Sequence, residues 1–143
     1  MAAPMFAAEN PRTQVPLDTA LADANALAAR KSGLAVVHVQ GDSMLPYFGD
    51  GAVLVIKPAA ASQLRPGMVV VYTNAFNETV AHRIVSADAG GCTVQGYNNT
   101  RADTTRVTAA NLQGVVYATF HSAADRPATA IAGLPLVLAA TAR

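Results

Sequence analysis

The chain has 143 residues, of which 52% are hydrophobic, and ten basic against nine acidic side chains give it a formal charge of +1. This length fits one domain with its own core, and the apolar fraction excludes a chain that is disordered throughout. The near-neutral charge provides no global field for nucleic acid, so we expect no nucleic-acid partner. Cys92 is the only cysteine, which excludes an internal disulfide and a cysteine-rich zinc cluster, and we expect it to be a packing residue.

The first third of the chain is predicted to hold an arm and one helix. Residues 1–16 contain prolines and little periodic pattern, and they lack the basic start and unbroken apolar run of a signal peptide. Apolar residues at helical spacing predict a helix from about Asp18 to Lys31, which Gly33 would end. We therefore expect residues 1–33 to be an N-terminal arm and helix that lie against the rest of the protein.

From Leu34 the sequence changes to short runs of Val and Ile separated by Pro and Gly turns. These runs predict strands at 35–40, 52–57, 68–72, 80–86, 92–95 and 114–120. Their spacing predicts a mainly β domain over 34–121, a coiled antiparallel β-sheet or barrel preceded by the short helix. A nucleotide-binding α/β fold is disfavoured, because the sequence contains no glycine-rich phosphate loop and no βαβ alternation.

Residues 122–143 form an apolar C-terminal segment. Its apolar run is shorter than the roughly 20 residues that span a bilayer as a helix, and Gly133 and Pro135 interrupt it. We expect this segment to pack on the core or to be a loose tail, with a peripheral membrane contact as the minority alternative. Without a signal peptide or a membrane helix, the sequence predicts a soluble, cytoplasmic protein.

A serine that is a candidate nucleophile follows the first predicted strand, in the loop Gly41-Asp42-Ser43-Met44-Leu45-Pro46. The strand would fix its position, and Gly41 permits a backbone approach that a Cβ would block. Serine needs a base within hydrogen-bond reach, and its own amide can donate to an oxyanion. Taken alone, however, this segment favours an ordinary turn.

The candidate base is His82, one of three histidines. A strand can hold an imidazole rigidly, and imidazole titrates near neutral pH, which suits proton transfer. A lone histidine in a strand is nevertheless more often a structural residue. We expect His38, between two valines, to be structural, and His121, beyond the last predicted strand, to be solvated.

Several segments, taken together and in order, resemble the family that contains signal peptidases I and the self-cleaving LexA and phage-repressor peptidases. The loop at 41–46, with Gly49-Asp50 and the strand at 52–57, resembles its nucleophile segment. The blocks Arg65-Pro-Gly-Met-Val-Val-Val71 and Ala81-His82-Arg83-Ile84-Val85 resemble its next strand and its base segment. A histidine at the base position, where bacterial signal peptidases and LexA have lysine, resembles the archaeal, endoplasmic-reticulum and sporulation-type branch.

Downstream, Gln95-Gly96-Tyr97-Asn98-Asn99 and Asp103 resemble the Gly-Asp-Asn-Asn segment and following aspartate of that branch. The resemblance covers about residues 36–116 and implies a serine endopeptidase with Ser43 as nucleophile, His82 as base and Asp103 orienting the imidazole. It implies no metal or cofactor. The expected partner is a peptide or protein substrate that lies extended beside a strand, with small residues such as alanine next to the cut.

Two departures from the family pattern keep alternatives open. Tyr97 stands where the family has the aspartate of Gly-Asp-Asn-Asn, and the transmembrane anchor of signal peptidases is missing. One alternative is a self-cleaving LexA-type regulator cut at Ser32-Gly33 or within Ala26–Ala29, although such relatives use lysine where His82 stands. The other is an inactive binding module, which Tyr97 supports. The sequence leaves the natural substrate and the oligomeric state open.

Overall fold

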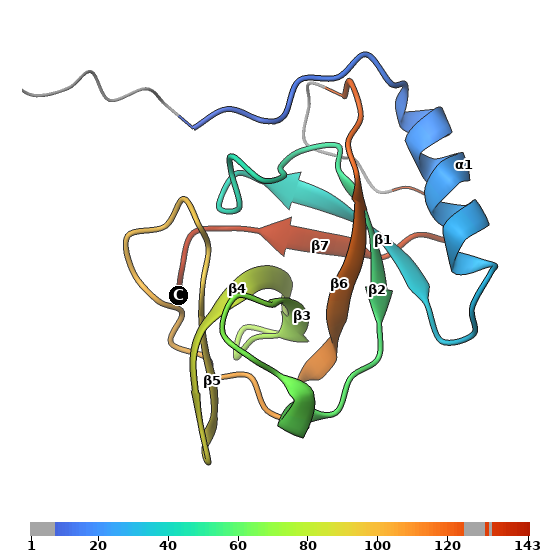
Figure 1. The fold of residues 1–143 in the computed structure, drawn as a ribbon. Coiled ribbons are helices and arrows are strands. Elements are labelled where there is room, and N and C mark those ends of the chain that lie inside the picture. The colour runs from blue at the N-terminus through green and yellow to red at the C-terminus, as the bar shows by residue number, and fades with distance from the viewer. Residues whose placement is uncertain (1–7, 125–130, 132) are drawn as a thin grey trace, which may run out of the picture.

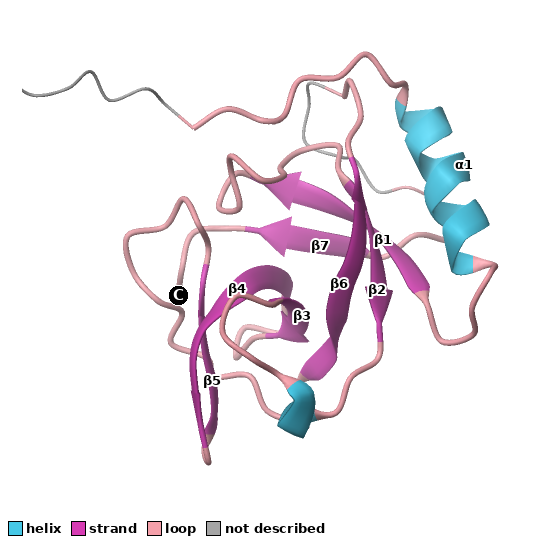
Figure 2. Ribbon diagram, in the orientation of Figure 1, coloured by secondary structure: helices cyan, strands magenta, loops and turns pink. Residues whose placement is uncertain are grey.

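A computed structural model describes residues 8–124, 131 and 133–143, and Figures 1 and 2 show them as one β-sheet structure with a helix on its outside. The predicted strands and helix all form, with ends that shift by a few residues. The elements are α1 (Leu17–Ala28), β1 (Ala35–Gly41), β2 (Val53–Lys57), a 3-10 turn η1 (Ala61–Gln63), β3 (Val69–Thr73), β4 (Thr79–Asp88), β5 (Gly91–Gln95), β6 (Leu112–Phe120) and β7 (Leu136–Ala139).

The strands form one 7-stranded sheet in the order β3-β6-β2-β1-β7-β4-β5. Because β3 also pairs with β4, the strands from β3 to β4 close into a barrel, and β5 extends the sheet from β4. Most neighbours are antiparallel, but β7 runs parallel to both β1 and β4. The mainly β barrel predicted from the sequence is therefore confirmed, and its pairing is mixed.

The core of the barrel is formed by apolar side chains at alternating positions of the strands. Side chains at every second position turn inward, so strands with Val, Leu and Ile at these positions bury a common core. Two residues from the nucleophile loop, Met44 and Phe48, complete it. The resulting cluster is Val37, Val39, Met44, Phe48, Ala52, Leu54, Ile56, Val71, Ala81, Val137 and Ala139.

Helix α1 packs on the outer side of the barrel. Ala20 and Ala24 are buried against Val53 and Val55 of β2, and these small side chains let the helix approach the strand closely. The helix ends at Ala28, earlier than the expected end at Lys31. No helix in the described ranges is long and apolar enough to cross a membrane.

The segment expected to pack on the core or to be loose contributes a strand. Residues Leu136–Ala139 form β7, which lies between β1 and β4 in the sheet (Figure 1). At the start of the same segment, Ser122 Oγ donates to the carbonyl of Gly51 at 2.7 Å. Residues 125–130 and 132 lie outside the described residues. The sheet thus includes residues on both sides of position 121, where the sequence placed the end of the β-rich domain.

Candidate active site

The structure brings together the three residues that the sequence singled out. Ser43 lies just beyond the end of β1, His82 lies in β4, and Asp103 lies in the loop between β5 and β6. Ser43 Oγ is 2.9 Å from His82 Nε2, and His82 Nδ1 is 2.6 Å from Asp103 Oδ2. All three side chains are buried, so water competes little for these contacts.

The carboxylate of Asp103 decides how the imidazole is used. A carboxylate accepts hydrogen bonds, so the proton of His82 lies on Nδ1 and Nε2 presents its lone pair to the hydroxyl of Ser43. This is the tautomer that a general base needs. The arrangement can therefore remove the proton of Ser43 and hold it on the imidazole.

Tyr72 is a member of this network that the sequence analysis missed. Its hydroxyl donates to Asp103 Oδ2, the oxygen that His82 also contacts. Burial, together with the bonded carboxylate, raises the pKa of Tyr72, so the phenol keeps its proton and remains a donor. A tyrosine among valines in a strand is a normal core residue, and no local signal distinguishes this one.

The segment after β5 fixes the nucleophile loop. The amide of Asn98 donates to the carbonyl of Ser43 at 2.7 Å, and the side chain of Asn98 donates to the carbonyl of Asp42 at 3.1 Å. Gly96 lies so close that a Cβ there would be 2.6 Å from the carbonyl oxygen of Ser43. This explains why glycine and asparagine occur in this segment.

A second support comes from the loop before β2. Asp50 Oδ1 accepts a hydrogen bond of 2.6 Å from the amide of Gly41, two residues before the nucleophile. Gly41 has a φ of 118°, a conformation that favours glycine. The Gly49-Asp50 pair that the sequence associated with the nucleophile loop therefore contacts that loop directly.

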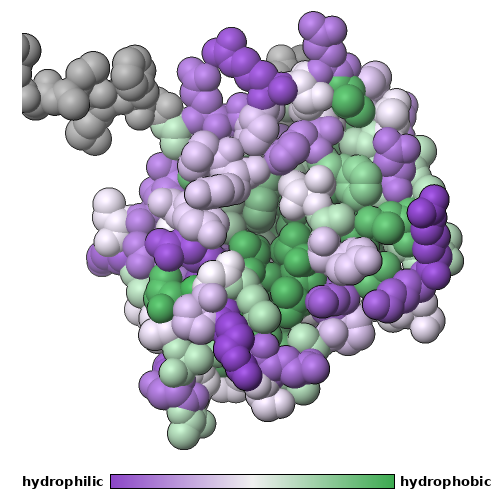
Figure 3. Space-filling model, viewed as in Figure 1, coloured by the Kyte–Doolittle hydropathy of each residue, from purple (hydrophilic) through white to green (hydrophobic). Residues whose placement is uncertain are grey.

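Tyr97, the departure from the family pattern, does not separate the nucleophile from the base. Its ring lies 4.2 Å from that of Tyr47 and 4.6 Å from the guanidinium of Arg83. These aromatic rings border a hollow of about 390 Å³, whose other lining residues include Met44, Phe48, Met68, Val69 and Val116. Figure 3 shows apolar residues gathered in the middle of one face, surrounded by polar ones.

The remaining residues that the sequence singled out lie elsewhere. Burial lowers the pKa of His38, against a smaller opposing effect of the Leu134 carbonyl, and this fits a structural role. His121 is half-buried, so the expectation that it is solvated was wrong, and burial lowers its pKa as well.

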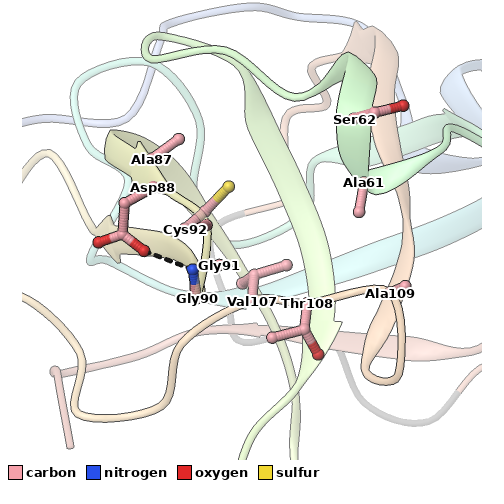
Figure 4. Close-up of a pocket in the computed structure, with 11 residues that line it drawn as sticks. Ala61, Ser62, Ala87, Asp88, Gly90, Gly91, Cys92, Val107, Thr108 and Ala109 are labelled. Atoms are coloured by element: carbon pink, nitrogen blue, oxygen red, sulfur yellow. Dashed lines mark hydrogen bonds between the residues drawn. The ribbon is translucent and has the colours of Figure 1, made fainter.

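Cys92 is buried, and this burial raises the pKa of its thiol. It borders a hollow of about 300 Å³ at the turn between β4 and β5, shown in Figure 4. In this turn Asp88 accepts a hydrogen bond of 2.7 Å from the amide of Gly90. The hollow contains no member of the serine–histidine network, so Cys92 has the packing environment that the sequence predicts.

Comparison with known proteins supports the resemblance noted in the sequence. The family model described as Peptidase S24-like matches residues 1–117, a range that includes Ser43, His82 and Asp103 and stops before β7. A comparison with curated proteins finds no match. The match covers most of the chain and agrees with the mainly β barrel, a fold of the LexA and signal-peptidase type. The chain belongs to the Peptidase S24-like family.

Proposed function

We propose that this protein is a serine endopeptidase in which Ser43 is the nucleophile, His82 the general base and Asp103 the group that orients the base. The observation that carries the proposal is the continuous series of contacts from Ser43 Oγ to His82 at 2.9 Å and from His82 to Asp103 at 2.6 Å. Both distances lie in the range of a working hydrogen bond before any substrate binds.

The reaction follows from these positions. Ser43 Oγ attacks the carbonyl carbon of the peptide bond, and its proton passes to His82 Nε2. His82 then gives this proton to the leaving amine as the C–N bond breaks, which leaves an ester on Ser43. A water molecule, deprotonated by His82, attacks this ester and releases the new carboxylic acid. Asp103 stabilises the imidazolium that forms in each half of the reaction.

The substrate class is a polypeptide in extended conformation, as the family resemblance implies. An extended segment is typically bound through its backbone hydrogen bonds, with side-chain pockets that provide selectivity. Histidine at position 82 favours the serine–histidine signal peptidase type over the serine–lysine enzymes. We therefore propose cleavage after small residues such as alanine.

The test is the rate at which a fluorophosphonate modifies Ser43, followed by intact-mass and peptide mapping. This small probe reports the activated serine without requiring a peptide to bind. We expect one adduct, located on Ser43, in the wild-type protein. Ser43→Ala abolishes it, and His82→Gln slows it by about 10⁴-fold, the scale on which triad residues act.

His121→Gln is the matched control, because His121 is outside the network. We expect this variant to react at the wild-type rate. A wild-type protein that forms no adduct, or a His82→Gln variant that reacts as fast as wild type, would show that the pair is not an activated nucleophile. The inactive binding module would then be the better description.

A further inference from the structure

Strand β7 is an extended segment that lies beside the nucleophile. It pairs in parallel with β1, with Leu136–Ala139 opposite His38–Gly41, and on its other side Leu138 pairs with Val80 of β4. The nucleophile follows β1 and the base lies in β4, so β7 runs between the two strands that carry the reacting groups (Figure 1).

The ladder between β1 and β7 continues to the nucleophile itself. The backbone amide of Ser43 donates a hydrogen bond of 3.0 Å to the carbonyl oxygen of Ala139. An amide in this position is the donor that stabilises the oxyanion in acyl transfer. The closeness of the approach depends on Gly41, since a Cβ there would lie 2.0 Å from the same oxygen. The carbonyl of Ala139 therefore accepts from the amide that would donate to the oxyanion.

The next residue is held by the other half of the site. The carbonyl oxygen of Ala140 accepts a hydrogen bond of 3.0 Å from Asn99 Nδ2 and lies 3.1 Å from His82 Nε2. Further along, the carbonyl of Arg143 accepts from the amide of Thr104. The bond between Ala139 and Ala140 is therefore anchored on both sides, with the nucleophile near one residue and the base near the other.

The side chains of this segment suit such a role. Ala139 and Val137 are fully buried and alternate with the less buried Leu136 and Leu138, as expected for an extended strand with one face on the core. The small side chain of Ala139 is a member of the buried core cluster, and its backbone is what lies close to Gly41.

We propose that β7 is a substrate of its own active site, and that Ser43 cleaves the peptide bond between Ala139 and Ala140 within the same chain. This inference rests on the proposed function. Ser43 Oγ attacks the carbonyl carbon of Ala139, and its proton moves through His82 to the nitrogen of Ala140 as the C–N bond breaks. Water then hydrolyses the Ser43 ester and leaves a free carboxyl group on Ala139, so that one water is consumed for each bond.

The N-terminal sites considered from the sequence lack this placement. Residues 26–28 belong to α1, and Ser32-Gly33 precedes β1, whereas Ser43 follows it. The 7 residues of β1 separate its ends by roughly 20 Å. Of the self-cleavage sites considered, only the bond after Ala139 lies against the nucleophile.

The experiment follows the intact mass of the full chain during incubation. We expect a new species that ends at Ala139 and a released fragment that begins at Ala140. The first-order rate constant of cleavage should not change over a hundredfold range of protein concentration. Ser43→Ala should remain intact. Ala140→Pro should also remain intact, because its leaving nitrogen is a constrained tertiary amide, whereas Ala142→Pro is the control that should still be cleaved.

Fluorophosphonate labelling of the same samples distinguishes a failure of the proposed peptidase function from a failure of the proposed self-cleavage after Ala139. If Ser43 forms its adduct while the bond after Ala139 remains intact, the inference is overturned and the proposed function stands. If neither adduct nor cleavage occurs, the proposed function fails together with the inference. Cleavage whose rate constant rises with protein concentration would overturn the proposal of cleavage within one chain. Prior labelling of Ser43 should stop cleavage in the wild-type protein.

Discussion

Removal of a single oxygen atom, in Tyr72→Phe, tests whether the buried network behaves as one unit. The hydroxyl of Tyr72 donates to Asp103, and the tyrosine side chain is fully buried. A hydrogen bond to a charged group contributes about 1.5–3 kcal/mol, and here its loss leaves Asp103 Oδ2 with His82 as its remaining bonded side chain. For 143 residues, a loss of about 2 kcal/mol lowers Tm by about 7 °C.

The same change should reduce the reactivity of Ser43, although Tyr72 does not contact Ser43. Tyr72 acts through Asp103, so it is a positioning residue, and we expect the fluorophosphonate rate to fall about tenfold, equivalent to about 1.4 kcal/mol. Thermal unfolding and the labelling rate are measured on the same preparation. Tyr117→Phe is the matched control, because Tyr117 is 45% exposed and its change should cost no more than about 0.5 kcal/mol.

A double-mutant cycle with Asp103→Asn separates the bond from the general effect of losing a buried hydroxyl. If the hydroxyl acts through Asp103, the two substitutions are coupled by about 1 kcal/mol or more. Additive effects on stability, or a Tyr72→Phe protein as stable and as reactive as Tyr117→Phe, would refute the reasoning.

Three further predictions concern other parts of the fold. Because burial lowers the pKa of His38, the unfolded chain binds a proton near pH 6.5 that the folded chain rejects, so stability is lost as the pH falls below this value. His38→Leu should therefore make the free energy of unfolding, measured with urea between pH 7.5 and 5, depend less on pH, by at most about 1.4 kcal/mol per pH unit. If the wild-type protein and the variant show the same slope of unfolding free energy against pH, the lowered pKa of His38 is contradicted. Cys92, with its raised thiol pKa, should react with Ellman's reagent only after unfolding, and rapid reaction in the native protein would show that it is not buried. Val137→Ala removes two methyl groups from a fully buried side chain and should cost about 2–3 kcal/mol by urea unfolding, and an unchanged midpoint would show that β7 does not belong to the core.

The sequence by itself determined the elements and the residue types of the site. Alternating Val and Ile between Pro and Gly turns is a local signal, and it predicted six strands, from β1 to β6, close to their observed positions. Ser43, His82 and Asp103 were identified through ordered motifs that resemble a known family. The end of the helix was less well predicted. Helix α1 stops at Ala28, which packs against the buried cluster that includes residues of β2, and local helix propensity contains no information about that tertiary contact.

Only the tertiary structure decided how these elements meet. The closure of β3 onto β4, and with it the contact between Ser43 and His82, depends on pairings between segments far apart in the chain. Tyr72 joins the network only because β3 lies beside β4. Strand β7 has 4 residues, too few for a recognisable period, and its partners precede it by more than 50 residues. A parallel strand of this kind is specified by the edges it fills, and those edges exist only in the folded protein.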